Sequence, residues 1–192
     1  MNKTPGGKAF LDASVLYGAF PRDFFIRLAL RQQFVPRWSA RVQDEWTTAL
    51  LRNRPDLKSA HIARTQRLMD AHLPDARVEG HEFLIDSLSL PDPDDRHVLA
   101  AAIHCGAEVI VTFNLRDFPA PVLAGFGIEA IHPDAFVLRL VKTSADAVIE
   151  TLRRLEAAYA DPPMSMTDIL EAMRRSGLAG SANAIAAATA PR

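Results

Sequence analysis

The sequence is poor in the features that mark secreted, disulfide-stabilised and membrane-spanning proteins. Its single cysteine, Cys105, excludes an internal disulfide and a zinc site built from several thiolates. No apolar run approaches the roughly 18 residues that a membrane-spanning helix requires. The start of the chain also lacks the uninterrupted apolar stretch of a secretion signal. We therefore expect a soluble, cytoplasmic protein without a membrane segment.

Several common binding motifs are absent as well. The glycines form neither of the phosphate-binding patterns G-x-x-x-x-G-K and G-x-G-x-x-G. The six histidines show no metal-ligand spacing, and we expect His97 to occupy an exposed helix position. No spaced aromatic platform for stacking bases accompanies Trp38 and Trp46, which we assign to the core or to an interface.

A strong charge of one sign is missing overall but not locally. The formal net charge is −1, yet residues 1–75 hold 12 basic and 7 acidic side chains, whereas residues 76–140 hold 4 and 10. This polarity suits a protein that attracts a polyanion with one surface and gathers carboxylates around cations elsewhere. Chance unevenness in solvated charge is the alternative interpretation.

Short apolar segments alternate with helical segments along most of the chain. This alternation predicts a three-layer α/β/α domain with a mainly parallel central sheet. The expected strands are 8–11, 34–36, 109–112 and 128–131, with a weaker candidate at 83–84. The expected helices are 22–32, one that Ser39 caps and that runs to about residue 53, 56–71, and 93–106, with Asp92 as its cap and Pro93 in its first turn.

The apolar strands stop after about Leu140. Two further helical stretches follow, at 145–159 and 167–176, and the Ala-rich tail 182–192 is expected to be frayed. We therefore predict a main domain over residues 1–140 and a helical C-terminal extension over residues 141–192.

Polar side chains end two of the expected strands. Asp12 ends the first strand, where a carboxylate is costly to bury unless it is paired or bound, although it can also cap the following turn. A later strand ends at Thr112, and Asn114 and Asp117 follow in the next loop. If these strands are neighbours, the side chains share one crevice at the carboxyl edge of the sheet, with Ser14 beside them.

Two expected helices each add a further acid. Helical spacing puts Glu45 beside apolar residues of the inward face, although a surface pair with Arg41 or Arg52 is an alternative. Asp95 lies on the apolar stripe of the helix 93–106, so we expect its carboxylate to point toward the strand ends.

Such a group of acids predicts a metal site. Three or four carboxylates within a few ångströms cannot all stay ionised without a cation, so the crevice either takes up protons or binds metal. Oxygen ligands without a thiolate suit Mg²⁺ or Mn²⁺. These ions neutralise phosphate and lower the pKa of an attacking water. The residues therefore predict hydrolysis of a phosphodiester.

The same residues resemble the PIN-domain ribonucleases, and within them the VapC-type toxins of bacterial toxin–antitoxin pairs. The resemblance covers residues 8 to about 140 and rests on the order of FLDASVL at 10–16, Glu45, DRHVLAAA at 95–102 and VIVTFNLRDF at 109–118. It implies that the catalytic metal ligands are Asp12, Glu45, Asp95 and Asp117, with Ser14, Thr112 and Asn114 in support. Asn114 stands where many members carry Asp, so whether Asn114 or Asp117 completes the site stays open.

The resemblance also implies partners. These are an RNA substrate cleaved with Mg²⁺ or Mn²⁺, a cognate antitoxin protein that places a basic side chain in the acidic site, and a second copy of the chain in a homodimer. Arg37, Arg41 and Arg52 in the basic first segment can hold the RNA backbone, since phosphate contacts position a substrate without reading its sequence. They can equally be solvated helix faces.

Two other functions compete with this prediction. The first is a catalytically depleted PIN-like module that binds RNA or protein, which the Asn114 departure keeps open. The second is a phosphoaspartate-type phosphatase beginning at Asp12. That pattern requires an acid where Ser14 stands, so it fits poorly.

Overall fold

The structure is a computed structural model that describes residues 4–189. Its centre is one five-stranded sheet in the order β3-β2-β1-β4-β5, and every pairing is parallel. The strands are β1 (Lys8–Leu11), β2 (Val35–Ser39), β3 (Arg77–Val78), β4 (Val109–Val111) and β5 (Glu129–Ile131). The predicted parallel α/β architecture is confirmed.

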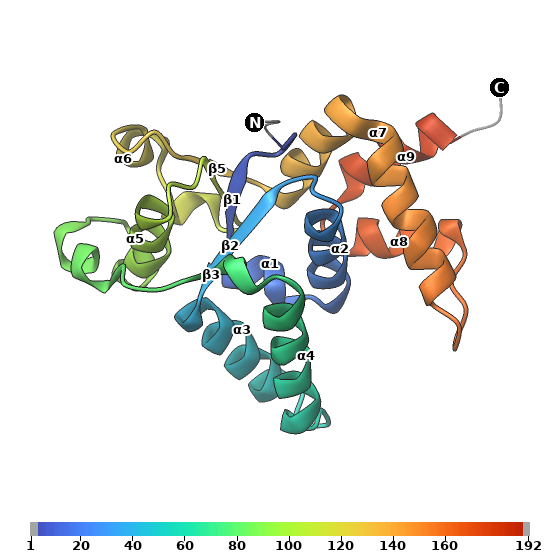
Figure 1. Cartoon of the computed structure of the whole chain (residues 1–192), viewed down its shortest axis with the longest axis horizontal. Coiled ribbons are helices and arrows are strands. Elements are labelled where there is room, and N and C mark those ends of the chain that lie inside the picture. Colours follow the sequence, from blue (N-terminus) through green and yellow to red (C-terminus); the bar gives the residue numbers. More distant parts are fainter. Residues whose placement is uncertain (1–3, 190–192) are drawn as a thin grey trace.

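Helices cover both sides of this sheet. In Figure 1, α5 and α6 lie on one side of the strands, whereas α2 and the C-terminal helices lie on the other. The α-helices are α1 (Ala13–Tyr17), α2 (Ala19–Leu30), α3 (Ala40–Asn53), α4 (Ser59–His72), α5 (Arg96–His104), α6 (Ala120–Ala124), α7 (Pro133–Ala158), α8 (Met166–Arg175) and α9 (Ala179–Thr189). Short 3₁₀ helices are η1 (Pro74–Ala76), η2 (Glu82–Ser87), η3 (Pro93–Asp95) and η4 (Leu115–Asp117).

Local signals in the sequence set several of these boundaries. The Ser39 hydroxyl accepts a hydrogen bond from the Val42 N–H at 3.2 Å and caps α3, as predicted. The carboxylate of Asp92 accepts from the Asp94 N–H at 2.9 Å, and Pro93 follows at the start of η3. Side-chain capping therefore orients both helices that carry candidate acids.

The core extends from the sheet into the C-terminal helices. Phe136 of α7 lies edge-on to Phe34, with ring centroids 5.2 Å apart, and stacks on Phe25 of α2 at 6.0 Å. Trp38 and Trp46 are fully buried, which confirms their assignment to the core. The aromatic packing joins α7 to the sheet domain.

The predicted strand at 83–84 is wrong. This segment belongs to the 3₁₀ helix η2, and Phe83 is 73% exposed. The edge strand of the sheet is instead the two-residue β3, which is too short to show an alternating pattern.

The expectation of a frayed tail is also wrong for the part that the structure describes. Ala182 and Ile185 of α9 are fully buried, because α9 packs against α7 and α8. The remainder of that prediction, residues 190–192, lies outside the described residues. The predicted boundary at 140 falls inside α7, close to Ser144, where the backbone is not helical.

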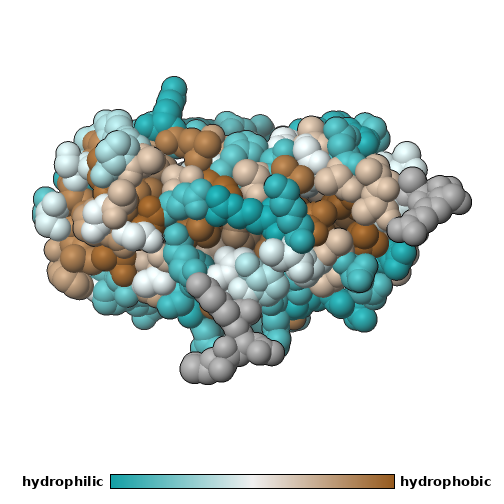
Figure 2. Space-filling view, turned by 90° about the horizontal axis from the view of Figure 1, so that it is seen from above, coloured by the Kyte–Doolittle hydropathy of each residue, from teal (hydrophilic) through white to brown (hydrophobic). Residues whose placement is uncertain are grey.

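Polar residues cover much of the molecular surface. Figure 2 shows hydrophilic residues breaking up the hydrophobic patches on the face seen from above Figure 1. Between Thr4 and Thr189, no helix is both long and apolar enough to cross a lipid bilayer.

The aromatic packing of α7 predicts a large loss of stability when Phe136 is truncated. Phe136 is 2% exposed, and Phe136→Ala should lower the free energy of unfolding by about 3–5 kcal/mol. The matched control Phe83→Ala, at an exposed ring, should change it by less than about 0.5 kcal/mol. Urea unfolding followed by circular dichroism measures both, and equal effects of the two variants would contradict this packing.

Candidate active site at the carboxyl edge of the sheet

Asp12 is fixed where β1 ends. Its carboxylate is 6% exposed, and Oδ2 accepts hydrogen bonds from the Ser14 hydroxyl at 2.6 Å and the Thr112 hydroxyl at 2.8 Å. The Ser14 N–H lies 3.4 Å from the same oxygen, so Asp12 also caps α1. Asp12 therefore caps the following turn, and two hydroxyls orient its carboxylate.

The ends of β1 and β4 are tied together at this point. The strands pair in parallel with Leu11 opposite Val111, which confirms that they are neighbours. The Ser14 hydroxyl oxygen accepts from the Phe113 N–H at 3.2 Å, and the Thr112 hydroxyl oxygen accepts from the Asn114 N–H at 2.9 Å. Each hydroxyl thus accepts a hydrogen bond from a backbone N–H and donates one to Asp12.

Asp95 lies close enough to Asp12 and Asp117 to be affected by their charges. Asp95 ends η3, immediately before α5, and burial raises its pKa to about 6, with the charges of Asp12, Asp117 and Asp92 adding to the increase. The Asp117 side chain is 14% exposed and lies 3.5 Å from the Arg116 guanidinium. Crowding of like charges is what the sequence predicted for this edge.

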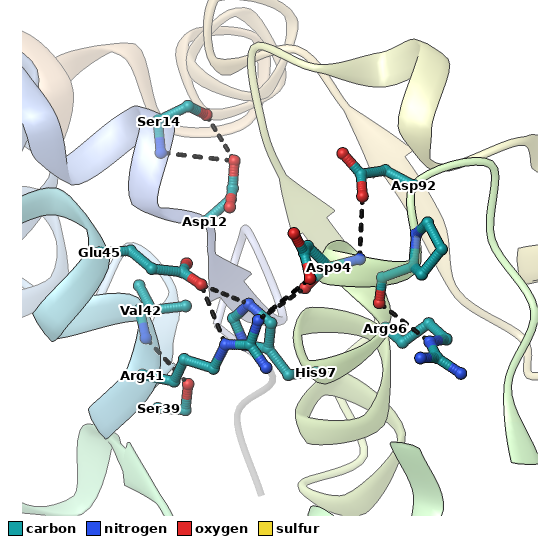
Figure 3. A network of polar contacts seen from close by, with 11 residues as sticks. Asp12, Ser14, Ser39, Arg41, Val42, Glu45, Asp92, Asp94, Arg96 and His97 are labelled. Carbon is teal, nitrogen blue, oxygen red and sulfur yellow. Dashed lines mark hydrogen bonds and ion pairs between the residues drawn. The ribbon is translucent and has the colours of Figure 1, made fainter. Parts of the chain in front are cut away.

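Glu45 of α3 has different partners. Its Oε1 lies 2.9 Å from His97 Nε2 and 3.1 Å from Arg41 Nε. Figure 3 shows the Glu45 carboxylate turned toward these two side chains, with Asp12 and Ser14 nearby. The surface pair with Arg41 that the sequence offered as an alternative is present, together with an inward contact to His97.

The prediction that His97 is exposed is wrong. The side chain is 1% exposed because α5 packs against β1 and β2, and its ring meets Glu45 of the neighbouring helix α3. The available signal was the pair Ala100 and Ala101, which lie three and four positions further on and mark this face of α5 as buried. A contact between side chains of two different helices has no sequence signal of its own.

Of the remaining predicted residues, Arg41, Arg52 and Asn114 lie on the surface near these acids. Arg37 does not, because it lines a different hollow together with Gln32 and Pro74. Arg41 and Arg52 are exposed on α3 and line a shallow hollow of about 330 Å³ that also includes Glu45. Arg37 is partly buried and donates to the Pro36 carbonyl at 2.9 Å. Asn114 is exposed at the start of η4, so its side chain lies next to the loop that ends in Asp117.

As the side chains stand, the four predicted ligands do not form one coordination shell. Within residues 4–189, no three His, Cys, Asp or Glu side chains are gathered closely enough to hold one ion. Asp12, Asp95 and Asp117 interact through their charges, whereas Glu45 is held by Arg41 and His97. The donor set, carboxylate oxygens without a thiolate, fits Mg²⁺ or Mn²⁺ in kind.

Comparison with known proteins defines the class of this chain. Residues 8–116 match the family described as PIN domain, and this match covers more than half of the chain. The chain belongs to the PIN-domain family.

A second match concerns the C-terminal helices, since residues 133–187 match the family described as VapC50 C-terminal domain. A curated relative, "Putative ribonuclease VapC50" of Mycobacterium tuberculosis (strain ATCC 25618 / H37Rv), is 43% identical over 79 residues, which cover 41% of this chain and 47% of that protein. The match therefore spans about half the length of the relative. No solved structure matches the chain.

Burial of the Asp95 carboxyl group, with like charges near it, predicts a stability that depends on pH in metal-free protein. The folded-state pKa of about 6 lies above the ordinary value of 3.8, so the folded protein binds more protons and loses stability as the pH rises between these values. Asparagine carries no charge to bury. Asp95→Asn should therefore stabilise the protein by about 2 kcal/mol at neutral pH and have little effect near pH 4.

Urea unfolding in EDTA at the two pH values measures this difference. The control is Asp94→Asn, because the Asp94 side chain is 93% exposed and follows the same turn. It should show no pH-dependent gain. A gain for Asp95→Asn that is equal at both pH values would disprove the proposed cause.

Proposed function

We propose that this protein is a metal-dependent ribonuclease that hydrolyses RNA phosphodiester bonds and acts as the toxin of a toxin–antitoxin pair. The observation that carries the proposal is the buried Asp12 carboxylate, oriented by two hydroxyls, whose charge acts on Asp95 together with that of Asp117. Membership of the PIN-domain family and the similarity to a protein named a ribonuclease support it.

The proposed cofactor is Mg²⁺ or Mn²⁺. Asp12, Asp95 and Asp117 are the proposed ligands on the sheet side of the crevice, and Glu45 is the proposed ligand from α3. A divalent ion would offset the repulsion that, after burial, adds to the raised pKa of Asp95. When bound, such an ion neutralises phosphate charge and lowers the pKa of an attacking water.

The protein's own residues prepare this site. Ser14 and Thr112 direct their protons to Asp12 Oδ2, which fixes the orientation of the carboxylate. His97 and Arg41 hold Glu45 at the edge of the same crevice. The exposed Arg52 lies on the adjoining hollow, where a guanidinium can pair with an RNA phosphate.

We propose two protein partners on the strength of the family likeness. One is an antitoxin that places a basic side chain among the acids, since a cation there would offset the same repulsion as a metal ion. The other is a second copy of the chain in a homodimer.

The second candidate function is a module that binds RNA or protein without cleaving it. One observation in its favour is that the Glu45 carboxylate already contacts Arg41 and His97. Another is that no three potential metal ligands lie close together within the described residues. A phosphoaspartate mechanism is disfavoured, because the position that would need an acid holds Ser14, whose hydroxyl donates to Asp12.

Removal of the central carboxylate tests the nuclease proposal. Asp12→Asn should lower Mn²⁺-dependent cleavage of RNA by about a hundredfold or more, on the scale seen when a group that stabilises transition-state charge is lost. Wild-type cleavage should stop in EDTA. Asp94→Asn is the matched control and should cleave like the wild type, since this side chain is 93% exposed and its pair with Arg41, at 3.9 Å, is long and solvated. Equal activity of wild type and Asp12→Asn under every condition would refute the proposal.

Metal binding can be measured without any RNA. Mn²⁺ should raise the free energy of unfolding of the wild type by about 2–3 kcal/mol at a concentration a hundred times its dissociation constant. Asp12→Asn should lose most of this gain and Asp94→Asn should keep it. RNA binding that is equally strong in Mn²⁺ and in EDTA, without metal stabilisation, would instead favour the binding module.

A further inference from the structure

The turn between α8 and α9 meets the loop that follows β4. Gly177 in this turn has φ +80°, and a Cβ placed there would lie 2.9 Å from Phe113 Cε1. Phe113 directly follows Thr112, one of the two residues whose hydroxyl donates to Asp12. A segment more than sixty positions further along the chain thus contacts the candidate active site.

Phe113 is held from two other directions. Its ring lies edge-on to the His132 ring, with centroids 5.0 Å apart, and its N–H donates to the Ser14 hydroxyl oxygen at 3.2 Å. His132 precedes α7 and caps it. The Phe113 ring therefore cannot move away from Gly177 without disturbing the start of α7.

The first turn of α9, which follows the α8–α9 turn directly, is anchored to α7 by a partly buried clamp. One oxygen of Asp134 accepts from the Gly180 N–H at 2.9 Å, and the other accepts from the Ser181 N–H at 2.7 Å and the Ser181 hydroxyl at 2.6 Å. Ser181 is fully buried, and a Cβ at Gly180 would lie 2.7 Å from Asp134 Oδ2. Figure 1 shows α9 lying against α7 on this side of the molecule.

We propose that the α8–α9 turn is a positioning element of the active site, acting through Phe113. The contact runs from Gly177 to the Phe113 ring, from the Phe113 N–H to the Ser14 hydroxyl, and from that hydroxyl to Asp12. The C-terminal helices thereby set the orientation of a metal-binding carboxylate. The expected effect on metal binding and cleavage rests on the proposed function. The expected effect of the turn on the position of the Phe113 loop does not.

Hydrogen-bond geometry gives the reason for the coupling. The Phe113 N–H donates a hydrogen bond to the Ser14 hydroxyl oxygen. This contact favours the rotamer in which the Ser14 hydroxyl donates its single proton to Asp12. If the Phe113 backbone shifts, Ser14 is free to rotate, and the Asn114 N–H moves away from Thr112 at the same time. Asp12 then loses both hydroxyl donors together, and supporting contacts of this kind change metal affinity by about 10–100-fold.

Two glycine substitutions separate this effect from ordinary backbone strain. Gly177→Ala adds a Cβ against Phe113, whereas Gly127→Ala adds one at a similar φ of +69° with no atom within 4 Å. Hydrogen exchange of the full chain, without metal, is followed at the amides of Phe113 and Asn114. These amides should exchange about tenfold faster in Gly177→Ala than in Gly127→Ala, because only the first variant disturbs the loop.

Metal affinity and rescue complete the test. The Mn²⁺ concentration that gives half-maximal thermal stabilisation should rise about tenfold in Gly177→Ala and stay unchanged in Gly127→Ala. Adding Phe113→Leu, which removes the atom that the new Cβ meets, should restore both the exchange and the Mn²⁺ affinity. If Gly177→Ala does not fold, Asp134→Asn, which weakens the clamp without touching Phe113, replaces it. It should show the same faster exchange and weaker Mn²⁺ binding, but Phe113→Leu should not rescue it, because no Cβ has been added.

The outcomes distinguish the two proposals. Equal exchange at Phe113 and Asn114 in Gly177→Ala and Gly127→Ala would overturn the positioning role. A wild type that shows no stabilisation by Mn²⁺ would count against the proposed function, and the exchange comparison would still decide whether the turn positions the loop.

Discussion

The candidate site depends on two hydroxyl groups that converge on one oxygen of a buried carboxylate. Asp12 can remain at the end of β1 because Ser14 and Thr112 compensate for the hydration it loses. Both hydroxyls are themselves held by backbone N–H groups of the loop after β4. The parallel pairing of β1 with β4 brings these groups together, so the sheet topology and the orientation of the carboxylate are parts of one arrangement.

The structural features that local sequence patterns determine could be predicted from the sequence. The apolar strands, the Ser39 cap and the cap at Asp92 each have a local cause, and the structure confirms them. The prediction that Asp12 and Thr112 lie close together rests on the rule that the carboxyl ends of parallel strands lie at one edge of a sheet. Their roles as metal ligand and support stay predictions, because ion binding is a property of side-chain geometry that no sequence pattern fixes.

The features that escaped prediction arise from contacts between distant segments. His97 is buried because α5 packs against the sheet and its ring meets α3, and α9 is ordered because Ala182 and Ile185 pack against other C-terminal helices. The strand β3 and the 3₁₀ helix η2 are too short to carry a periodic signal. The contact between Gly177 and Phe113, which are more than sixty positions apart, has no signal in the sequence of either segment.

The aromatic contact between α7 and the sheet has a consequence for how this protein can be divided. Phe136 belongs by sequence match to the C-terminal family, yet its ring packs on Phe25 and Phe34 of the PIN domain. A polypeptide ending before Pro133 would leave those two rings facing water and would be prone to self-association. The two matched segments are therefore separate in sequence comparison but share one hydrophobic interior, and neither is expected to behave as an independent folding unit.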